Sequence, residues 1–221
     1  MSIITSLTRS WLTRSLKPFT FTNEYDQQLP YSSCESLGLY IHIPFCKSIC
    51  AFCPYCKVIY SEESCGRYID ALIREIHMVG SQHEGRKKVT SLYFGGGTPA
   101  LVSDRLGEII AAVEEHFIIT EGIGVELHPD NVTPPLLRTL KDAGVTKISI
   151  GIQSFRTKFQ SILGRTNVDA EALRAALSEV PFETCLLYTS HPERDAGELE
   201  ADNRPFVHFI ELCMAGKEDV K

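Results

Sequence analysis

The sequence predicts an α/β fold with a parallel sheet, because short apolar strand patterns alternate with amphipathic helix patterns along the chain. Five strand patterns and four intervening helix patterns follow one another between residues 39 and 188. Right-handed crossovers between parallel strands leave a (β/α) barrel or a doubly wound sheet as the main architectures. In both architectures, functional residues gather at the carboxyl ends of the strands.

The elements are justified in order by their residue patterns. The first strand is expected at 39–43, where LYIHI is a short apolar and β-branched run. The first helix is expected at 61–79, because apolar residues recur there at helical spacing: Tyr68, Ile69, Leu72, Ile73 and Ile76. The later strands are expected at 89–94, 124–128, 147–152 and 182–188, and the later helices near 103–117, 133–143 and 169–179.

Composition and charge limit the class of partner. The 221 residues are 43% hydrophobic, which suffices for one sizeable core. No apolar run approaches the roughly eighteen residues of a membrane span, so none is expected. A net charge of -6 argues against nucleic acid and favours a small-molecule partner. The cysteines cluster instead of forming a disulfide framework, and no secretory signal is recognised, so a reducing, cytoplasmic location is expected.

Residues 1–38 are expected to be an N-terminal extension with no recognised domain. The segment carries Arg9, Arg14 and Lys17 among many serines and threonines, and no acidic residue precedes Glu24. This composition is typical of a transit peptide, but a short, poorly ordered extension is the favoured interpretation.

Three closely spaced cysteines follow the first strand. Cys46, Cys50 and Cys53 have the spacing C-x3-C-x2-C within CKSICAFCPYC. Thiolates are soft ligands that suit zinc or an iron–sulfur cluster. Structural zinc usually draws its ligands from two separated pairs, whereas three ligands from one loop suit three neighbouring irons of a cubane. A cluster with one open iron is therefore favoured over zinc and over unliganded thiols.

Four blocks of sequence resemble the radical S-adenosylmethionine (SAM) superfamily, specifically the oxygen-independent coproporphyrinogen III oxidases and their haem-chaperone relatives. These blocks are YIHIPFC, FGGGTPALV, VELHPDNVT, and ISIGIQSF followed by LGR. The resemblance implies a radical SAM domain at 39–188 with a partial (β/α) barrel of parallel strands. It also implies a [4Fe-4S] cluster on Cys46, Cys50 and Cys53, whose open iron chelates SAM. A reduced cluster then cleaves SAM to a 5′-deoxyadenosyl radical.

The resemblance implies roles for the second and third blocks. Gly95, Gly96 and Gly97, followed by Thr98, would meet the methionine end of SAM, because a backbone without Cβ atoms approaches a ligand closely. The alternative is a tight turn without a ligand. Glu126 would accept hydrogen bonds from the ribose hydroxyls, and the alternative is an outward, solvated carboxylate.

Other cofactor contacts come from the remaining positions of the resemblance. It implies that Gln153 contacts the adenosyl moiety and that Arg165 binds the cofactor carboxylate. It places Tyr40 near the sulfonium and Phe52 beside the adenine, with core packing as the alternative. Cys56 is not assigned as a ligand, because it stands three residues after the third cluster cysteine where the dehydrogenases have a cysteine after two.

The implied function is oxidative decarboxylation of coproporphyrinogen III in haem biosynthesis, with a flavodoxin or ferredoxin as electron donor. One alternative is a haem chaperone, for which His42 is a weak candidate ligand. Another is an inactive fragment of such a protein. A tRNA-modifying radical enzyme is disfavoured by the acidic balance.

The end of the sequence departs from the family pattern. Residues 189–221 are expected to form a divergent acidic tail, in which TSHPERDAGELEADNRP replaces an expected strand and Gly-Leu-Pro-Gly turn. Residues 205–216 have the pattern of one short helix. The barrel is therefore expected to be incomplete at its C-terminal end, in a chain that is truncated or altered in frame.

Overall fold

The computed structural model describes residues 34, 36–50, 53, 55–82, 84–153, 160–161 and 169–187. The chain divides into two units, Met1–Pro30 and Tyr31–Lys221, and every described residue belongs to the second. The acidic tail at 189–221, its expected helix and most of the N-terminal extension lie outside the described residues. No helix among the described residues is both long enough and apolar enough to cross a membrane.

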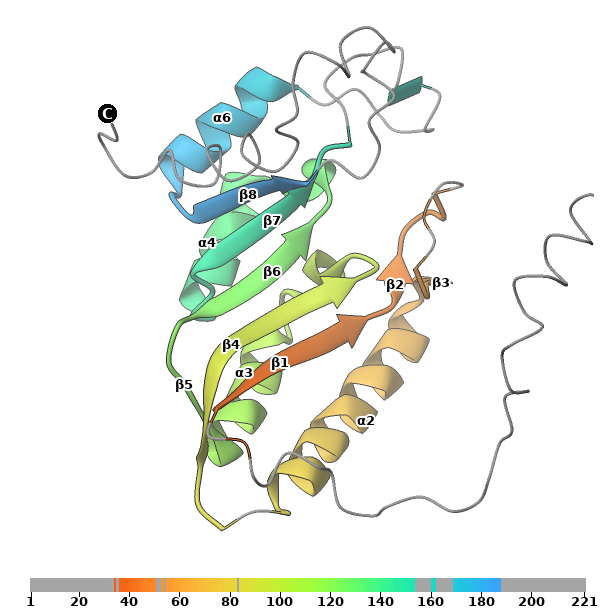
Figure 1. Ribbon diagram of the computed structural model, residues 1–221. Helices are drawn as coiled ribbons and strands as arrows, with labels where there is room; N and C mark the ends of the chain where they lie inside the picture. The colour runs from red at the N-terminus through yellow and green to blue at the C-terminus, as the bar shows by residue number, and fades with distance from the viewer. Residues whose placement is uncertain are drawn as a thin grey trace, which may run out of the picture. The chain divides into compact units, whose positions relative to one another are not determined.

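A parallel sheet organises the fold, as predicted (Figure 1). Its main strands lie in the order β1, β4, β6, β7, β8, so each lies beside the main strand that precedes it in sequence. They comprise Ser36–Ile43, Lys87–Gly96, Ile123–Leu127, Lys147–Gly151 and Glu183–Leu187. This sequential order is that of a (β/α) barrel, because a doubly wound sheet reverses its strand order midway.

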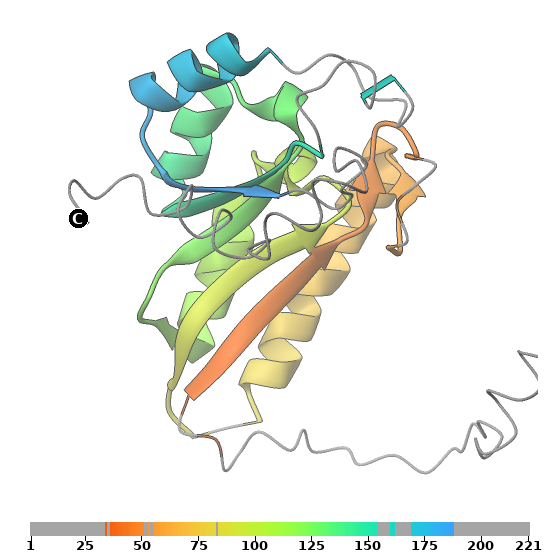
Figure 2. The ribbon, with the colours of Figure 1, turned by 45° about the horizontal axis from the view of Figure 1, so that its top comes forward.

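Among the described residues, the helices that connect these strands and have defined bounds lie along one face of the sheet (Figure 2). They are α2 (Glu62–Gly80), α3 (Leu106–His116), α4 (Pro134–Asp142) and α6 (Ala170–Glu179). Helix α2 begins where the Ser61 hydroxyl accepts from the Ser64 N–H, and α6 begins where the Asp169 carboxylate accepts from two amides of the first turn. Short 3₁₀ turns, η1 (Pro99–Val102) and η2 (Pro129–Asn131), follow β4 and β6.

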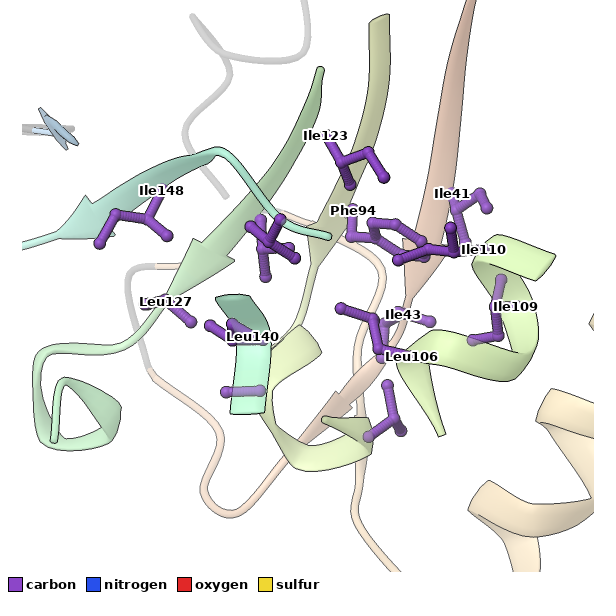
Figure 3. Close-up of a cluster of buried hydrophobic side chains, with 14 of the residues drawn as sticks. Ile41, Ile43, Phe94, Leu106, Ile109, Ile110, Ile123, Leu127, Leu140 and Ile148 are labelled. Atoms are coloured by element: carbon purple, nitrogen blue, oxygen red, sulfur yellow. The ribbon is translucent and has the colours of Figure 1, made fainter. Parts of the chain in front are cut away.

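The core lies between the sheet and the helices, because alternate residues of each strand point toward the helices. Ile41 and Ile43 of β1 are buried among them, together with Phe94 of β4 (Figure 3). The intervening residues, such as Tyr40 and His42, are less buried and belong to the opposite face of the sheet. The sheet therefore presents an apolar face to the helices and a second face on which functional side chains can stand.

Three short strands and an earlier start of β1 were not predicted. Strand β1 begins at Ser36, so residues 36–38 belong to the sheet although they were assigned to the extension. Strands β2 (Phe45–Cys46) and β3 (Val58–Ile59) form a separate parallel pair. Strand β5 (Phe117–Ile119) pairs with the start of β4. Strands of two or three residues are too short to carry a recognisable periodicity.

Candidate functional site

The segment that carries the clustered cysteines, residues 46–56, is called the cysteine loop, and the β2–β3 pair holds its base. The Val58 N–H donates to the carbonyl oxygen of Pro44 at 2.8 Å, and the Tyr60 N–H donates to that of Cys46 at 2.9 Å. Phe45, only 3% exposed, packs edge-on against the rings of Tyr60 and Tyr68. These contacts fix the two ends of the loop while its thiols remain at the edge of the core.

The glycine turn, Gly95–Gly97 at the end of β4, is hydrogen-bonded to the same loop through its backbone. The Gly97 N–H donates to the Ile43 carbonyl oxygen at 2.7 Å, and the Thr98 N–H donates to that of Phe45 at 2.8 Å. A Cβ atom at Gly97 would lie 2.5 Å from the Phe45 carbonyl oxygen, so no other residue fits without displacing the backbone. The Thr98 hydroxyl also lies 3.7 Å from the Cys46 sulfur. The cysteine loop and the glycine turn are thus one packed unit.

The three cysteines of the motif form a thiol set that suits a cluster better than a single ion. Cys46, Cys50 and Cys53 are partly buried, and none of them is in a disulfide. They are not among the described residues whose ligand atoms lie within 4.8 Å of one another. Thiolates that share one tetrahedral zinc would be about 3.8 Å apart, whereas a cubane holds its thiolates on separate irons. Burial, opposed by the Thr98 hydrogen bond, raises the pKa of Cys46.

Cys56 differs from these three cysteines. Its side chain is exposed, and its backbone carbonyl oxygen lies 3.0 Å from Nε2 of His42. A carbonyl oxygen only accepts, so Nε2 is the donor of this hydrogen bond, and Nδ1 lies 3.3 Å from the Tyr40 hydroxyl as its hydrogen-bond partner. His42 therefore links Tyr40 to the end of the cysteine loop, and both of its ring nitrogens are engaged.

Two tyrosines stand on the sheet face beside the glycine turn. Tyr40 of β1 and Tyr93 of β4 are paired in register and stack with ring centroids 6.3 Å apart. A Cβ atom at Gly95 would lie 2.8 Å from the Tyr40 ring, and one at Gly124 would lie 2.6 Å from the Tyr93 ring. The two glycines thus leave room for the rings. Burial and the nearby Glu126 carboxylate raise the pKa of both tyrosines, although Tyr40 remains 58% exposed.

Glu126 of β6 reaches the glycine turn from the strand that lies beside β4 in the sheet. Its Oε2 accepts a hydrogen bond of 3.1 Å from the Gly96 N–H. Gly96 has φ of +114°, a conformation that favours glycine. Glu126 is partly buried, and its role toward a ribose stays a prediction. This carboxylate therefore joins β6 to the glycine turn.

Gln153 follows β7 in a conformation rare for its residue type. Its φ is +69°, the single positive value among the described residues other than glycine, and it is 4% exposed. Its N–H donates to the Leu187 carbonyl oxygen of β8 at 3.2 Å. A buried residue held in this region of backbone space is a candidate for function.

The structure brings together most of the residues that the sequence singled out. The cysteine loop, Gly95–Gly97, Thr98, Tyr40 and Glu126 meet at the carboxyl edge of β1, β4 and β6. Gln153 follows the carboxyl end of β7. Phe52 and Arg165 lie outside the described residues, so their expected roles stay predictions.

Sequence reasoning named His42 only as a weak candidate ligand for haem, not as a contact of Tyr40, and it did not name Tyr93 at all. Period-two alternation along β1 puts His42 on the same face as Tyr40, so that signal was available. The placement of Tyr93 beside Tyr40 depends on the pairing register of β1 with β4, which the sequence does not specify.

A cavity of about 170 Å³ lies further toward the start of the strands on this face, lined by Ser91, Tyr93, Lys147, Ser149, Glu183 and Cys185 among others.

Comparisons with known proteins agree with this arrangement. The model of the family described as "Radical SAM superfamily" matches residues 40–202. The anaerobilin synthase of Escherichia coli O157:H7 is 37% identical over 72% of this chain and 37% of its own length. The haem chaperone HemW of Lactococcus lactis is 32% identical over 60% of this chain and 34% of its own.

Two coproporphyrinogen oxidases are similarly related. The oxygen-independent coproporphyrinogen III oxidase of Paracoccus denitrificans is 34% identical over 59% of this chain and 30% of its own length. The solved structure of the Escherichia coli coproporphyrinogen III oxidase HemN, titled a radical SAM enzyme, superposes with a TM-score of 0.62 at 29% identity. The match covers 69% of this chain and 36% of that one. The chain spans about a third of the length of the curated relatives it matches. From its cysteine loop, its sheet and the family match, this chain belongs to the radical SAM superfamily.

Proposed function

We propose that the chain holds a [4Fe-4S] cluster and SAM at the carboxyl edge of its sheet and acts on a tetrapyrrole. Membership of the superfamily implies both cofactors. The observation that carries the proposal is the joining of Cys46, the glycine turn and Glu126 by hydrogen bonds into one unit. Cys46, Cys50 and Cys53 would hold the cluster. In the same proposal, the protein is cytoplasmic and receives its electron from a donor such as a flavodoxin or ferredoxin.

The residues around the cysteine loop would bind and orient SAM. The backbone of Gly95–Gly97 would take the methionine end, while Glu126 would accept hydrogen bonds from the ribose. Tyr40 would lie near the sulfonium, with its position fixed by His42 and Gly95. When bound, the cluster and SAM supply a 5′-deoxyadenosyl radical that can take a hydrogen atom from a substrate carbon. Gln153 would contact the adenosyl moiety, as would Phe52 and Arg165 in the roles predicted for them.

For the substrate, we propose coproporphyrinogen III. Loss of a hydrogen atom from a propionate side chain, followed by loss of carbon dioxide and of one electron to an acceptor, would leave a vinyl group. The names of the relatives support a tetrapyrrole, because they refer to coproporphyrinogen, haem and anaerobilin. Anaerobic turnover of coproporphyrinogen III with SAM, followed by detection of carbon dioxide and the vinyl product, tests this proposal.

The second candidate is a haem chaperone, supported by the relative of that name at comparable identity. His42, its weak candidate ligand, has both ring nitrogens engaged, so coordination of haem iron there would break one hydrogen bond. Titration with haem while the Soret absorbance is followed separates the candidates. Haem binding without consumption of coproporphyrinogen III would select the chaperone, and turnover would select the dehydrogenase.

Glu126→Gln is expected to weaken SAM binding by about 10- to 100-fold, because hydrogen bonds to a charged group contribute about 1.5–3 kcal/mol. The amide oxygen of glutamine still accepts from the Gly96 N–H, so the fold should be retained. Calorimetric titration of the cluster-loaded chain with SAM measures the change. Glu114→Gln, on the exposed side of α3, is the matched control and should bind SAM normally. An unchanged affinity in Glu126→Gln would remove this carboxylate from the cofactor site.

A further inference from the structure

A second group of metal-binding side chains lies at the opposite end of the sheet. His77 is in the last turn of α2, and Glu115 and His116 end α3. Residue 116 immediately precedes β5, which pairs with the first residues of β4, whereas the cysteine loop lies beside the last residues of β4. The two sites are thus separated by the length of that strand. None of these three residues takes part in the proposed SAM chemistry.

The distances within this group fit three ligands of one ion. Nδ1 of His77 lies 3.1 Å from Nε2 of His116 and 3.6 Å from Oε2 of Glu115. All three ligand atoms lie within 4.8 Å of one another. Nitrogen and oxygen ligands at about 2.0–2.1 Å from a tetrahedral zinc ion are separated by about 3.4 Å. The two separations that involve His77 therefore bracket the value that zinc requires.

The local sequence of α2 makes this approach possible. A Cβ atom at Gly80 would lie 2.2 Å from the His116 ring, so only glycine lets that ring rest against the last turn of α2. The His77 and His116 rings meet edge-on, with centroids 5.3 Å apart. Both histidines stand at helix C-termini, where the backbone dipoles favour a cation.

The exposure of the group allows a metal ion to enter. The His77 side chain is 41% exposed and the Glu115 side chain 65% exposed, so an ion can reach them from solvent and keep a water molecule as its fourth ligand. Without a metal, Nδ1 of His77 and Nε2 of His116 share the proton of one hydrogen bond. An ion would replace that proton, as metals do when they bind histidine.

We propose that His77, Glu115 and His116 form a binding site for a divalent transition-metal ion, with zinc as the preferred occupant, that ties α2 to α3. Two imidazoles and a carboxylate suit zinc and disfavour calcium or magnesium, which take oxygen ligands. An ion that binds only the folded chain raises its stability in proportion to the logarithm of metal concentration. The site is separate from the iron–sulfur site in place and in ligand type.

The test uses the chain without a histidine tag and with its cluster assembled, so that the thiols of the cysteine loop are occupied. The protein is treated with a chelator under anaerobic conditions and titrated with zinc chloride in a calorimeter. Bound zinc is then counted after gel filtration, and iron is counted in the same sample. Wild type and Glu114→Gln are expected to bind one zinc ion per chain, with unchanged iron content.

Two variants test the assignment of the ligands. His77→Gln and Glu115→Gln should each weaken zinc binding at least tenfold and remove the zinc-induced rise in melting temperature. Both changes are on partly exposed side chains, so the fold should be retained. Zinc bound as tightly by both variants as by wild type would overturn the proposal, and so would wild type that binds no zinc at micromolar concentration. Either failure would leave the cluster and its iron content unaffected, and hence the proposed function untouched.

Discussion

Cys50→Ala is expected to abolish cluster assembly, lowering the iron bound after anaerobic reconstitution from about four atoms per chain to less than about one. Three cysteines of one loop would supply all the protein ligands of the cluster, so removal of one leaves two irons without a thiolate. The loop backbone should survive, because its base is held by the β2–β3 pair and by the glycine turn. Iron and sulfide analysis, together with the visible absorbance of the cluster, measures the loss.

Cys56→Ala is the matched control, since it removes a thiol from the same segment. The contact of Cys56 with His42 uses the backbone carbonyl, which alanine retains. Iron content should therefore equal that of wild type. Normal iron content in Cys50→Ala, or loss of iron in Cys56→Ala, would show that the cluster ligands have been assigned to the wrong cysteines.

Gly97→Ala is expected to separate the glycine turn from the cysteine loop. The added Cβ would lie 2.5 Å from the Phe45 carbonyl oxygen and 2.8 Å from the Pro44 carbonyl carbon, both of which are backbone atoms. No rotamer change relieves such contacts, so we expect a loss of about 3 kcal/mol in the free energy of unfolding. Iron uptake should fall as well, because the Thr98 N–H bond to Phe45 lies in the displaced turn. Urea unfolding of the apo chain and iron analysis provide the two readouts.

The control for this substitution is Gly107→Ala, at an exposed position in the first turn of α3. A Cβ atom there meets nothing within 4 Å, and alanine is the better helix former by about 0.5–1 kcal/mol. This variant should be slightly more stable than wild type and should take up iron normally. A Gly97→Ala protein that matches it in stability and iron content would contradict the packing described for the loop and the turn.

The main elements of the fold were predictable because each carries a periodic pattern long enough to read. Helix α2 was expected at 61–79 and comprises Glu62–Gly80, and the strand expected at 147–152 is β7, Lys147–Gly151. The choice between a barrel and a doubly wound sheet was less accessible from the pattern, because it depends on strand order. The resemblance to the radical SAM superfamily implied a partial barrel of parallel strands, and the sequential strand order agrees with it.

The candidate site was predictable in its residues but not in its contacts. The spacing of the cysteines and the Gly95–Gly97 run are local features of the sequence. The hydrogen bond from Gly96 to Glu126 joins residues of different strands, and the stacking of Tyr40 on Tyr93 depends on register. Backbone strain such as the positive φ of Gln153 is likewise set by tertiary structure.

The pairing of His77 with His116 was inaccessible to sequence analysis for the same reason. The two residues are 39 positions apart on different helices, and neither belongs to a recognised motif. Gly80 gave only a weak indication of a close contact between α2 and α3, because a glycine at the end of a helix is usually explained as a helix terminator. In the structure it also makes room for a ring from the neighbouring helix.

The formation of 5′-deoxyadenosine from SAM tests the central claim most directly. The chain would be reconstituted anaerobically with iron and sulfide, reduced, and incubated with SAM before the nucleoside is measured. Wild type and Cys56→Ala are predicted to form 5′-deoxyadenosine, whereas Cys46→Ala, Cys50→Ala and Cys53→Ala are predicted to form none. A wild-type chain that carries a complete cluster yet forms no 5′-deoxyadenosine, or formation that continues without these cysteines, would contradict the claim that this site cleaves SAM.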